Sequence, residues 1–155
     1  MVVRSYKEED LGGIQQLLHG VPSPTGRMYD AKEMIREHRR DDIYVAEMEG
    51  QVVGFAIAAF NDWNWTAYLD FTLVGMDHLR RGIGTALLEA VVKSMAAKGA
   101  RFIYTETGEP NTGGLCFYIQ NGFVPTGVIP DYYREGEDAI ILVRKLSNRE
   151  VGPAV

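Results

Sequence analysis

Two glycines stand between an apolar stretch and an amphipathic segment, an arrangement that can bind a phosphate. The apolar residues 69–74 predict a strand, and apolar residues at helical spacing over 86–95 predict a helix. The connection contains Arg80-Arg81-Gly82-Ile83-Gly84-Thr85. N–H groups in the first turn of a helix attract anions, and glycine lets a ligand approach the main chain closely. The two arginines would add charge for further phosphates.

Three kinds of phosphate site are compatible with such a turn. A nucleotide P-loop requires a lysine after its last glycine, and no lysine follows here. The dinucleotide fingerprint requires a third glycine where Leu87 stands, although Glu106 lies where a ribose-binding carboxylate is expected. The remaining chain is also too short for a dinucleotide-binding sheet with a substrate domain. The third kind of site binds the pyrophosphate of coenzyme A.

Two segments resemble the motifs of the GCN5-related N-acetyltransferase (GNAT) superfamily. The pattern [R/Q]-x-x-G-x-[G/A] falls on Leu79–Gly84, with leucine at the first position and an arginine next to it. The pattern N-x-x-A-x-x-[FL]-Y-x-x-x-G-F falls on Asn111–Phe123, with Gly114 in place of alanine. The spacing is nearest to the ribosomal-protein N-terminal acetyltransferase branch, and the resemblance covers nearly the whole chain.

The resemblance implies a GNAT fold of the α/β class. This fold has a mixed, mostly antiparallel sheet of six to seven strands, splayed at the acetyl-CoA site, with about four helices on its two faces. The periodicity of the sequence agrees with it. It predicts helices over 10–19, 30–40 and from 111, and strands over 2–4, 43–47, 52–60, 69–74, 101–107, 123–129 and 139–146.

Three local signals refine these elements. We expect Asp10 to cap the first helix and Asn111 to cap the last, and Glu49-Gly50 to form a hairpin turn. We expect residues 1–146 to form a single acetyltransferase domain and residues 147–155 a flexible tail.

Composition narrows the class of protein. A net charge of −5 disfavours a broad nucleic-acid surface. One cysteine, Cys116, excludes an intrachain disulfide, and neither a signal peptide nor a membrane span is recognisable, so we expect a cytoplasmic protein without a membrane partner. The three histidines lack metal-ligand spacing, and no metal is expected. Homodimerisation is plausible for the superfamily.

The resemblance implies transfer of an acetyl group from acetyl-CoA to a primary amine by direct attack in a ternary complex. Glu106 would be the base that deprotonates the amine, or else a solvated carboxylate at a strand end; Asp70 and Glu109 are weaker alternatives. Tyr118 would protonate the leaving thiolate, because the ordinary pKa of a phenol, about 10, exceeds that of a thiol, about 8.5. Its alternative role is packing beside Phe117.

Acetyl-CoA, or coenzyme A, is thus the expected cofactor, and a main-chain N–H near the end of strand 69–74 would stabilise the oxyanion. The expected cofactor contacts are Leu73, Val74, Gly75, Leu79, Arg80, Arg81, Gly82, Ile83, Gly84, Thr85, Asn111, Phe117 and Tyr118.

Aromatic and acidic side chains on the acceptor side could hold an ammonium group. The candidates for substrate binding are Tyr29, Glu33, Trp63, Trp65, Asp70, Tyr132 and Tyr133. The acceptor would be a peptide N-terminus, a lysine, a polyamine or a small-molecule amine. The alternative function is a coenzyme A-binding regulatory module without catalysis.

Overall fold

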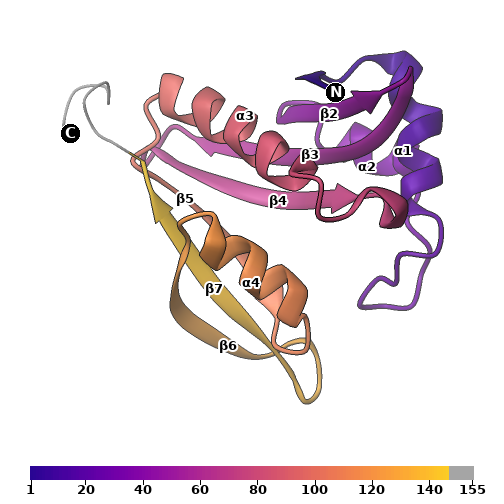
Figure 1. The fold of residues 1–155 in the computed structure, drawn as a ribbon. Helices are drawn as coiled ribbons and strands as arrows, with labels where there is room; N and C mark the ends of the chain where they lie inside the picture. Colours follow the sequence, from indigo (N-terminus) through magenta and orange to yellow (C-terminus); the bar gives the residue numbers. More distant parts are fainter. Residues whose placement is uncertain (147–155) are drawn as a thin grey trace. The chain divides into compact units, whose positions relative to one another are not determined.

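Seven strands, four α-helices and two short 3-10 helices form residues 1–146, the part of the chain that the computed structural model describes (Figure 1). The strands are β1 (Val2–Ser5), β2 (Asp42–Met48), β3 (Gln51–Asn61), β4 (Thr66–Val74), β5 (Phe102–Gly108), β6 (Val124–Arg134) and β7 (Glu137–Lys145). The helices are α1 (Leu11–Leu18), α2 (Ala31–Glu37), α3 (Ile83–Ala97) and α4 (Thr112–Gln120), with 3-10 turns η1 (Glu8–Asp10) and η2 (Met76–His78).

One sheet contains all seven strands, in the order β1-β2-β3-β4-β5-β7-β6. The pairing of β4 with β5 is parallel, whereas β1–β2, β2–β3, β5–β7 and β6–β7 are antiparallel. The predicted mostly antiparallel sheet with four helices is therefore confirmed. The parallel pair determines which residues of β4 lie opposite which residues of β5, and both strands carry candidate site residues.

The chain divides into two compact units. The first consists of Met1–Ala59 and Leu69–Ser94, and the second consists of Phe60–Tyr68 and the described chain from Met95 onward. The single domain predicted over residues 1–146 stays a prediction, and the predicted tail 147–155 lies outside the described residues. Among the described residues, no helix has the length and apolar character needed to cross a bilayer.

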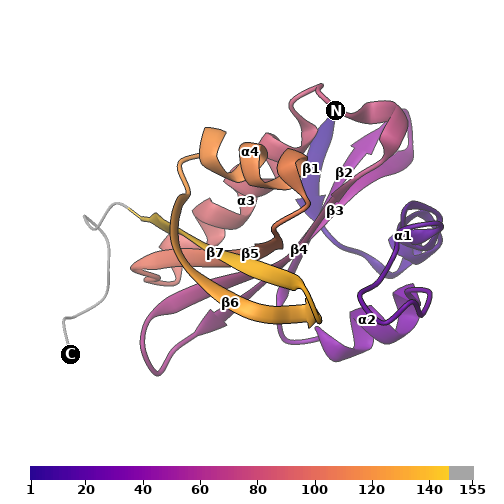
Figure 2. The ribbon, with the colours of Figure 1, turned by 90° about the horizontal axis from the view of Figure 1, so that it is seen from below.

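In the first unit, helices cover both faces of the sheet (Figure 2). Ile14 of α1 and Met34 of α2 pack in one cluster with Phe55 of β3. On the other face, a Cβ atom at Gly54 would lie 3.1 Å from the Leu87 side chain of α3. Glycine at position 54 therefore lets α3 approach β3 closely.

Asp10 does not cap α1, so that prediction was wrong. Its side chain makes no capping hydrogen bond to the helix and is 4% exposed. The carboxylate instead accepts two hydrogen bonds from the Arg4 guanidinium, both 2.8 Å, and one from the Lys7 N–H. Arg4 also contacts Glu47 at 2.7 Å. A bidentate arginine competes with the helix for the carboxylate and here takes precedence over capping.

In the second unit, β6 and β7 form a long hairpin (Figure 1), and β6 is an edge strand. Its pairing with β7 is interrupted between Pro125 and Gly127 and again between Ile129 and Arg134. Pairing resumes at Arg134, so β6 extends beyond the strand predicted over 123–129. The strand exposes the apolar side chains Val124, Val128, Ile129 and Tyr132.

Candidate active site

A turn with free N–H groups precedes α3 in the first unit. The first main-chain hydrogen bond of the helix runs from the Ala86 N–H to the Gly82 carbonyl, at 3.0 Å. The N–H groups of Ile83, Gly84 and Thr85 therefore belong to the first turn, where they have no acceptor within the helix. The side chain of Ile83 is buried, so this residue could offer a ligand only its main chain.

Two residues of this turn have left-handed backbone conformations. Gly82 has a φ of 78°, which glycine adopts without steric penalty, whereas Arg80 has a φ of 60°, which is unfavourable for a residue with a Cβ atom. Arg80, Arg81 and Thr85 are exposed, and the Leu79 side chain is 48% exposed. The turn thus presents main-chain N–H groups and two guanidinium groups to solvent, as an anion site requires.

The end of β4, just before this turn, limits the choice of oxyanion donor. The Gly75 N–H donates to the Val53 carbonyl at 2.9 Å, so Gly75 is not available as that donor. Leu73 and Val74 remain the candidates. Glycine at position 75 is required by packing and not by φ, because a Cβ atom there would lie 3.1 Å from the Leu17 side chain.

The same stretch contains buried polar atoms that lack partners. Among the described residues, Thr72 Oγ1 and His78 Nδ1 are buried without a hydrogen-bond partner. Buried polar atoms in native proteins nearly always have partners. They lie on either side of Leu73–Gly75 in the sequence, where the cofactor is expected, and the amide-rich arm of coenzyme A could supply hydrogen bonds of this kind. The residues of the first unit therefore fit coenzyme A.

In the second unit, the Tyr68 hydroxyl donates a hydrogen bond of 2.7 Å to Glu106 Oε1. The parallel pairing places Tyr68 of β4 opposite Tyr104 of β5, and their ring centroids are 5.0 Å apart. Glu106 stands two residues after Tyr104 and so projects from the same face of β5. The candidate base is thus held by a phenol that the sequence did not single out.

Tyr133 interacts electrostatically with Glu106 and with two further phenols. Burial raises the pKa of Tyr133, and the charge of Glu106 and interactions with Tyr132, Tyr118 and Glu137 raise it further. The Tyr133 ring lies against β5, since a Cβ atom at Gly108 would be 3.4 Å from it. The structure therefore brings together the candidate base, the candidate acid Tyr118 and the two candidate acceptor tyrosines. The Tyr133 phenol, whose pKa is raised above the ordinary value of about 10, is protonated at neutral pH.

Asn111 and Tyr118 are positioned by α4. The Asn111 side chain accepts a hydrogen bond from the Gly114 N–H at 3.0 Å and donates one to Thr107 Oγ1 at 3.1 Å, which confirms the predicted cap and ties α4 to β5. The Tyr118 ring packs edge-on against Phe117 and Phe123, at 5.3 and 5.4 Å between centroids. Packing and catalysis are thus compatible roles for Tyr118.

Two acceptor candidates meet in the first unit. Asp70 contributes to the raised pKa of Tyr29, after burial, so the carboxylate lies near that phenol. Asp70 Oδ2 is 2.8 Å from His38 Nε2, and His38 Nδ1 is 2.6 Å from Asp41 Oδ2. The exposed carboxylate of Glu33 lies 4.0 Å from the Arg36 guanidinium.

Trp63 and Trp65 lie in the second unit but away from Glu106. The Trp65 carbonyl accepts a hydrogen bond from the Arg101 N–H, just before β5 begins. Glu106 is five residues farther along, about 16 Å of extended strand. Trp65 packs edge-on against Phe60, and Trp63 is 80% exposed. The structure therefore separates the two tryptophans from the other candidates of the unit.

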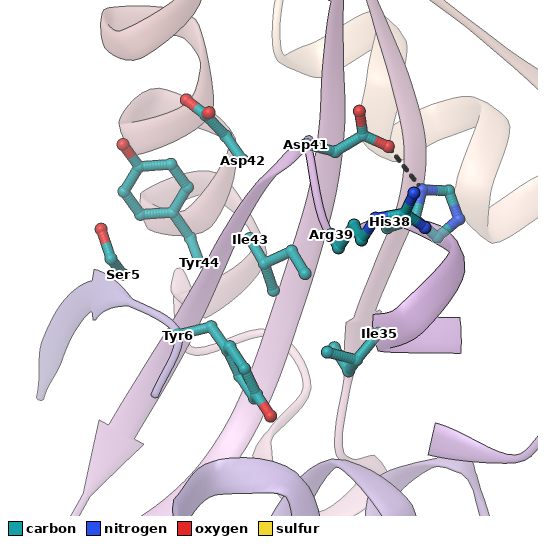
Figure 3. Close-up of a pocket in the computed structure, with 9 residues that line it drawn as sticks. All are labelled: Ser5, Tyr6, Ile35, His38, Arg39, Asp41, Asp42, Ile43 and Tyr44. Atoms are coloured by element: carbon teal, nitrogen blue, oxygen red, sulfur yellow. Dashed lines mark hydrogen bonds and ion pairs between the residues drawn. The ribbon is translucent and has the colours of Figure 1, made fainter. Parts of the chain in front are cut away.

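A cavity of about 420 Å³ lies in the first unit, between α2 and the start of β2 (Figure 3). Figure 3 shows the apolar side chains of Ile35 and Ile43 and the ring of Tyr6 around it, with the His38–Asp41 pair on one side. None of the predicted site residues lines it. Among the described residues, no group of histidine, cysteine and acidic side chains has the arrangement of a metal site.

Comparison with known proteins gives the class of this chain, that of the acyl-CoA-dependent N-acyltransferases. The profile of the acetyltransferase (GNAT) family matches residues 9–123, and the chain belongs to this family. An uncharacterized N-acetyltransferase of Methanocaldococcus jannaschii is 28% identical, over 100% of this chain and 97% of its own. An N-alpha-acetyltransferase of Sulfurisphaera tokodaii is 33% identical, over 66% of this chain and 68% of its own.

Two solved structures have similar folds. The ribosomal-protein-S18-alanine N-acetyltransferase of Escherichia coli has a TM-score of 0.81 and 21% identity, with 99% of both chains covered. A protein from Bacillus anthracis, solved in complex with acetyl coenzyme A, has a TM-score of 0.65 and 26% identity, over 69% of this chain and 63% of its own. The GNAT fold, the N-acetyltransferase class and the use of acetyl-CoA by the family are thus shown.

Proposed function

We propose that this N-acetyltransferase transfers an acetyl group from acetyl-CoA to a primary amine, foremost a peptide N-terminus, with Glu106 as the base. The observation that carries the proposal is the group around Glu106, in which a carboxylate held by Tyr68 lies near the phenols of Tyr118 and Tyr133. The name of the Sulfurisphaera tokodaii relative supports an α-amine as the acceptor.

The turn before α3 would hold the donor. The N–H groups of Ile83, Gly84 and Thr85, with Arg80 and Arg81, would bind the pyrophosphate, because main-chain donors and guanidinium groups together suit phosphate oxygens. Leu79 and the exposed Gly82 would contribute main-chain contacts, and Asn111 and Phe117 would border the pantetheine arm. Thr72 and His78 would gain hydrogen-bond partners from the bound molecule.

The reaction would proceed by direct attack. Glu106 takes a proton from the ammonium group, and the nitrogen attacks the thioester carbonyl, forming a C–N bond and a tetrahedral oxyanion. A main-chain N–H of Leu73 or Val74 stabilises the oxyanion. The C–S bond then breaks, Tyr118 donates its proton to the thiolate, and the proton that the nitrogen loses as the amide forms restores the phenol.

The acceptor would lie against tyrosines and a carboxylate. Tyr132 and Tyr133 of β6 would contact the amine-bearing group beside Glu106, and Asp70 with Tyr29 would attract a positive charge. We also infer that both units act as one acetyltransferase domain, since the family match includes residues of both. A cytoplasmic location and the absence of nucleic-acid partners agree with one cysteine and a net charge of −5.

The first test is thiol release from acetyl-CoA in the presence of peptides, lysine derivatives, polyamines and small amines, with the product mass determined. We expect release to depend on one class of amine and that amine to gain one acetyl group. Tight binding of coenzyme A without turnover on any amine would favour a regulatory module instead.

The second test is Glu106→Gln, which we expect to lower kcat at least about 100-fold while leaving the Kd for coenzyme A unchanged. The matched control is Glu109→Gln, because Glu109 is an exposed carboxylate near the same strand end. Equal loss in both variants, or full activity of Glu106→Gln, would contradict the assignment of the base.

A further inference from the structure

We propose that Tyr68 is a positioning residue that keeps Glu106 ionised and correctly oriented. This inference rests on the proposed function, since it concerns the base of that reaction. The observation behind it is the hydrogen bond of 2.7 Å from the Tyr68 hydroxyl to Glu106 Oε1. A phenol at its ordinary pKa has one proton to donate at neutral pH, so this contact favours the carboxylate form of Glu106.

The register of the sheet explains how β4 supplies this donor to a side chain of β5. Tyr68 and Tyr104 are paired in the parallel ladder, and their rings pack at 5.0 Å. The side chains of Tyr68 and Tyr104 project from the same face of the sheet as Glu106, because Glu106 is two residues after Tyr104 and residues two apart in a strand share a face. The Tyr104 ring thereby supports the Tyr68 ring, and the Tyr68 hydroxyl reaches the neighbouring strand.

Further titratable groups act on Tyr133, the phenol of β6 whose pKa the charge of Glu106 also raises. They include Glu137 of β7 and Tyr118 of α4, and a phenol at its ordinary pKa is uncharged at neutral pH. Tyr132 adds a further neutral phenol on β6. The hydrogen bond from the Tyr68 hydroxyl stabilises the carboxylate of Glu106, because a donor favours the charged form of its acceptor.

The test is Tyr68→Phe, which removes one oxygen atom. We expect kcat to fall about tenfold, because a base that is no longer held spends less time in the reactive orientation. We expect the acid limb of the pH profile of kcat to move up by about one pH unit, because a carboxylate without its donor binds protons more readily. The KM for acetyl-CoA should stay unchanged.

The matched control is Tyr104→Phe, which removes the same atom from the adjoining ring. We expect it to leave kcat and the pH profile as in the unaltered protein. An equal shift of the acid limb in both variants, or none in Tyr68→Phe, would overturn the inference. Should Tyr68→Phe fail to fold, 3-fluorotyrosine at position 68 alone is nearly isosteric and a stronger donor, and it should move the limb to lower pH.

A double-mutant comparison separates this inference from the proposed function. If Tyr68 acts only through Glu106, Tyr68→Phe has no further effect on kcat in the Glu106→Gln background. Independent, multiplying effects would show that Tyr68 acts on substrate itself and would overturn the positioning role. Full activity of Glu106→Gln would refute the base and with it the positioning role, whereas an inactive Glu106→Gln beside an unaltered Tyr68→Phe would overturn the positioning role alone.

Discussion

Arg80 combines an unfavourable backbone conformation with a position in the proposed phosphate site. A φ of 60° costs a residue with a Cβ atom about 1 kcal/mol, a cost that glycine does not bear. Strained residues of this kind are frequent at ligand sites. The strained conformation of Arg80 therefore agrees with the proposed phosphate site.

The strain at Arg80 gives a prediction for variants of Arg80 and Arg81. We expect Arg80→Gly to leave the free energy of unfolding unchanged or to raise it by up to about 1 kcal/mol, because the strain is relieved. It should also weaken coenzyme A binding about fivefold through the lost charge. Urea unfolding and calorimetry would measure both. Arg81→Gly is the control, since it loses the same charge but relieves no left-handed backbone conformation. A lower free energy of unfolding for Arg80→Gly than for Arg81→Gly would contradict the prediction.

Tyr68 is the partner of Glu106 that the sequence did not reveal. Glu106, Tyr118 and Tyr133 stand out by motif or composition, but the partner of Glu106 depends on the alignment of β4 with β5. Those strands are separated by α3, so no local spacing encodes their register. The hydrogen bond of Gly75 could not be predicted either, because its N–H donates to the Val53 carbonyl of β3, a strand that is distant in sequence.

Helix α4 shows how an element can depend on one glycine. The Asn111 side chain folds over the first turn, and a Cβ atom at Gly114 would lie 2.9 Å from Asn111 Cγ. No atom lies within 4 Å of a Cβ atom at Gly113. Gly114, which departs from the alanine usual in the family pattern, thus makes room for the cap.

The two glycines should therefore respond in opposite ways to alanine. We expect Gly113→Ala to raise the free energy of unfolding by about 0.5 kcal/mol through helix propensity. Gly114→Ala should lower it by about 1 kcal/mol, because the displaced Asn111 loses its capping bond. Thermal and urea unfolding of both variants would measure this. A stabilising Gly114→Ala would show that Asn111 caps the helix in another rotamer without loss.

Element types were predictable, and most boundaries were predicted to within one or two residues. Hydrophobic periodicity indicated the helices and strands of both units correctly, as it does wherever one face is buried. The hairpin turn at Glu49-Gly50 is confirmed by positive φ at both residues. The extension of β6 to Arg134 could not be predicted, because its pairing resumes beyond an interruption that depends on β7.

For the whole molecule, the ion pair of Asp10 makes stability depend on pH. The hydrogen bonds from Arg4 outweigh burial and lower the pKa of Asp10 in the folded state. A lowered folded pKa stabilises the protein above the unfolded value, about 4, and this stabilisation is lost as the pH falls through the folded value. Acid should therefore unfold the protein partly by protonating this carboxylate.

The corresponding variant is Asp10→Asn. We expect its free energy of unfolding at pH 7 to be about 2 kcal/mol lower, because charge-assisted hydrogen bonds are lost. Below about pH 4 the difference from the unaltered protein should shrink. Urea unfolding from pH 7 to pH 2.5 would measure it. Glu9→Gln, whose exposed carboxylate lies 3.8 Å from Lys7, should change little, and a constant difference across this range would contradict the explanation.

The hairpin of β6 and β7 has a further consequence for how the protein behaves at high concentration. A long apolar edge strand invites other chains to add strands, the first step of amyloid-like aggregation. Pro125 and Pro130 lack N–H groups, and two interruptions break the ladder. The open edge therefore offers no continuous row of donors. The prolines and the two interruptions therefore disfavour self-association through β6, although its apolar side chains are exposed.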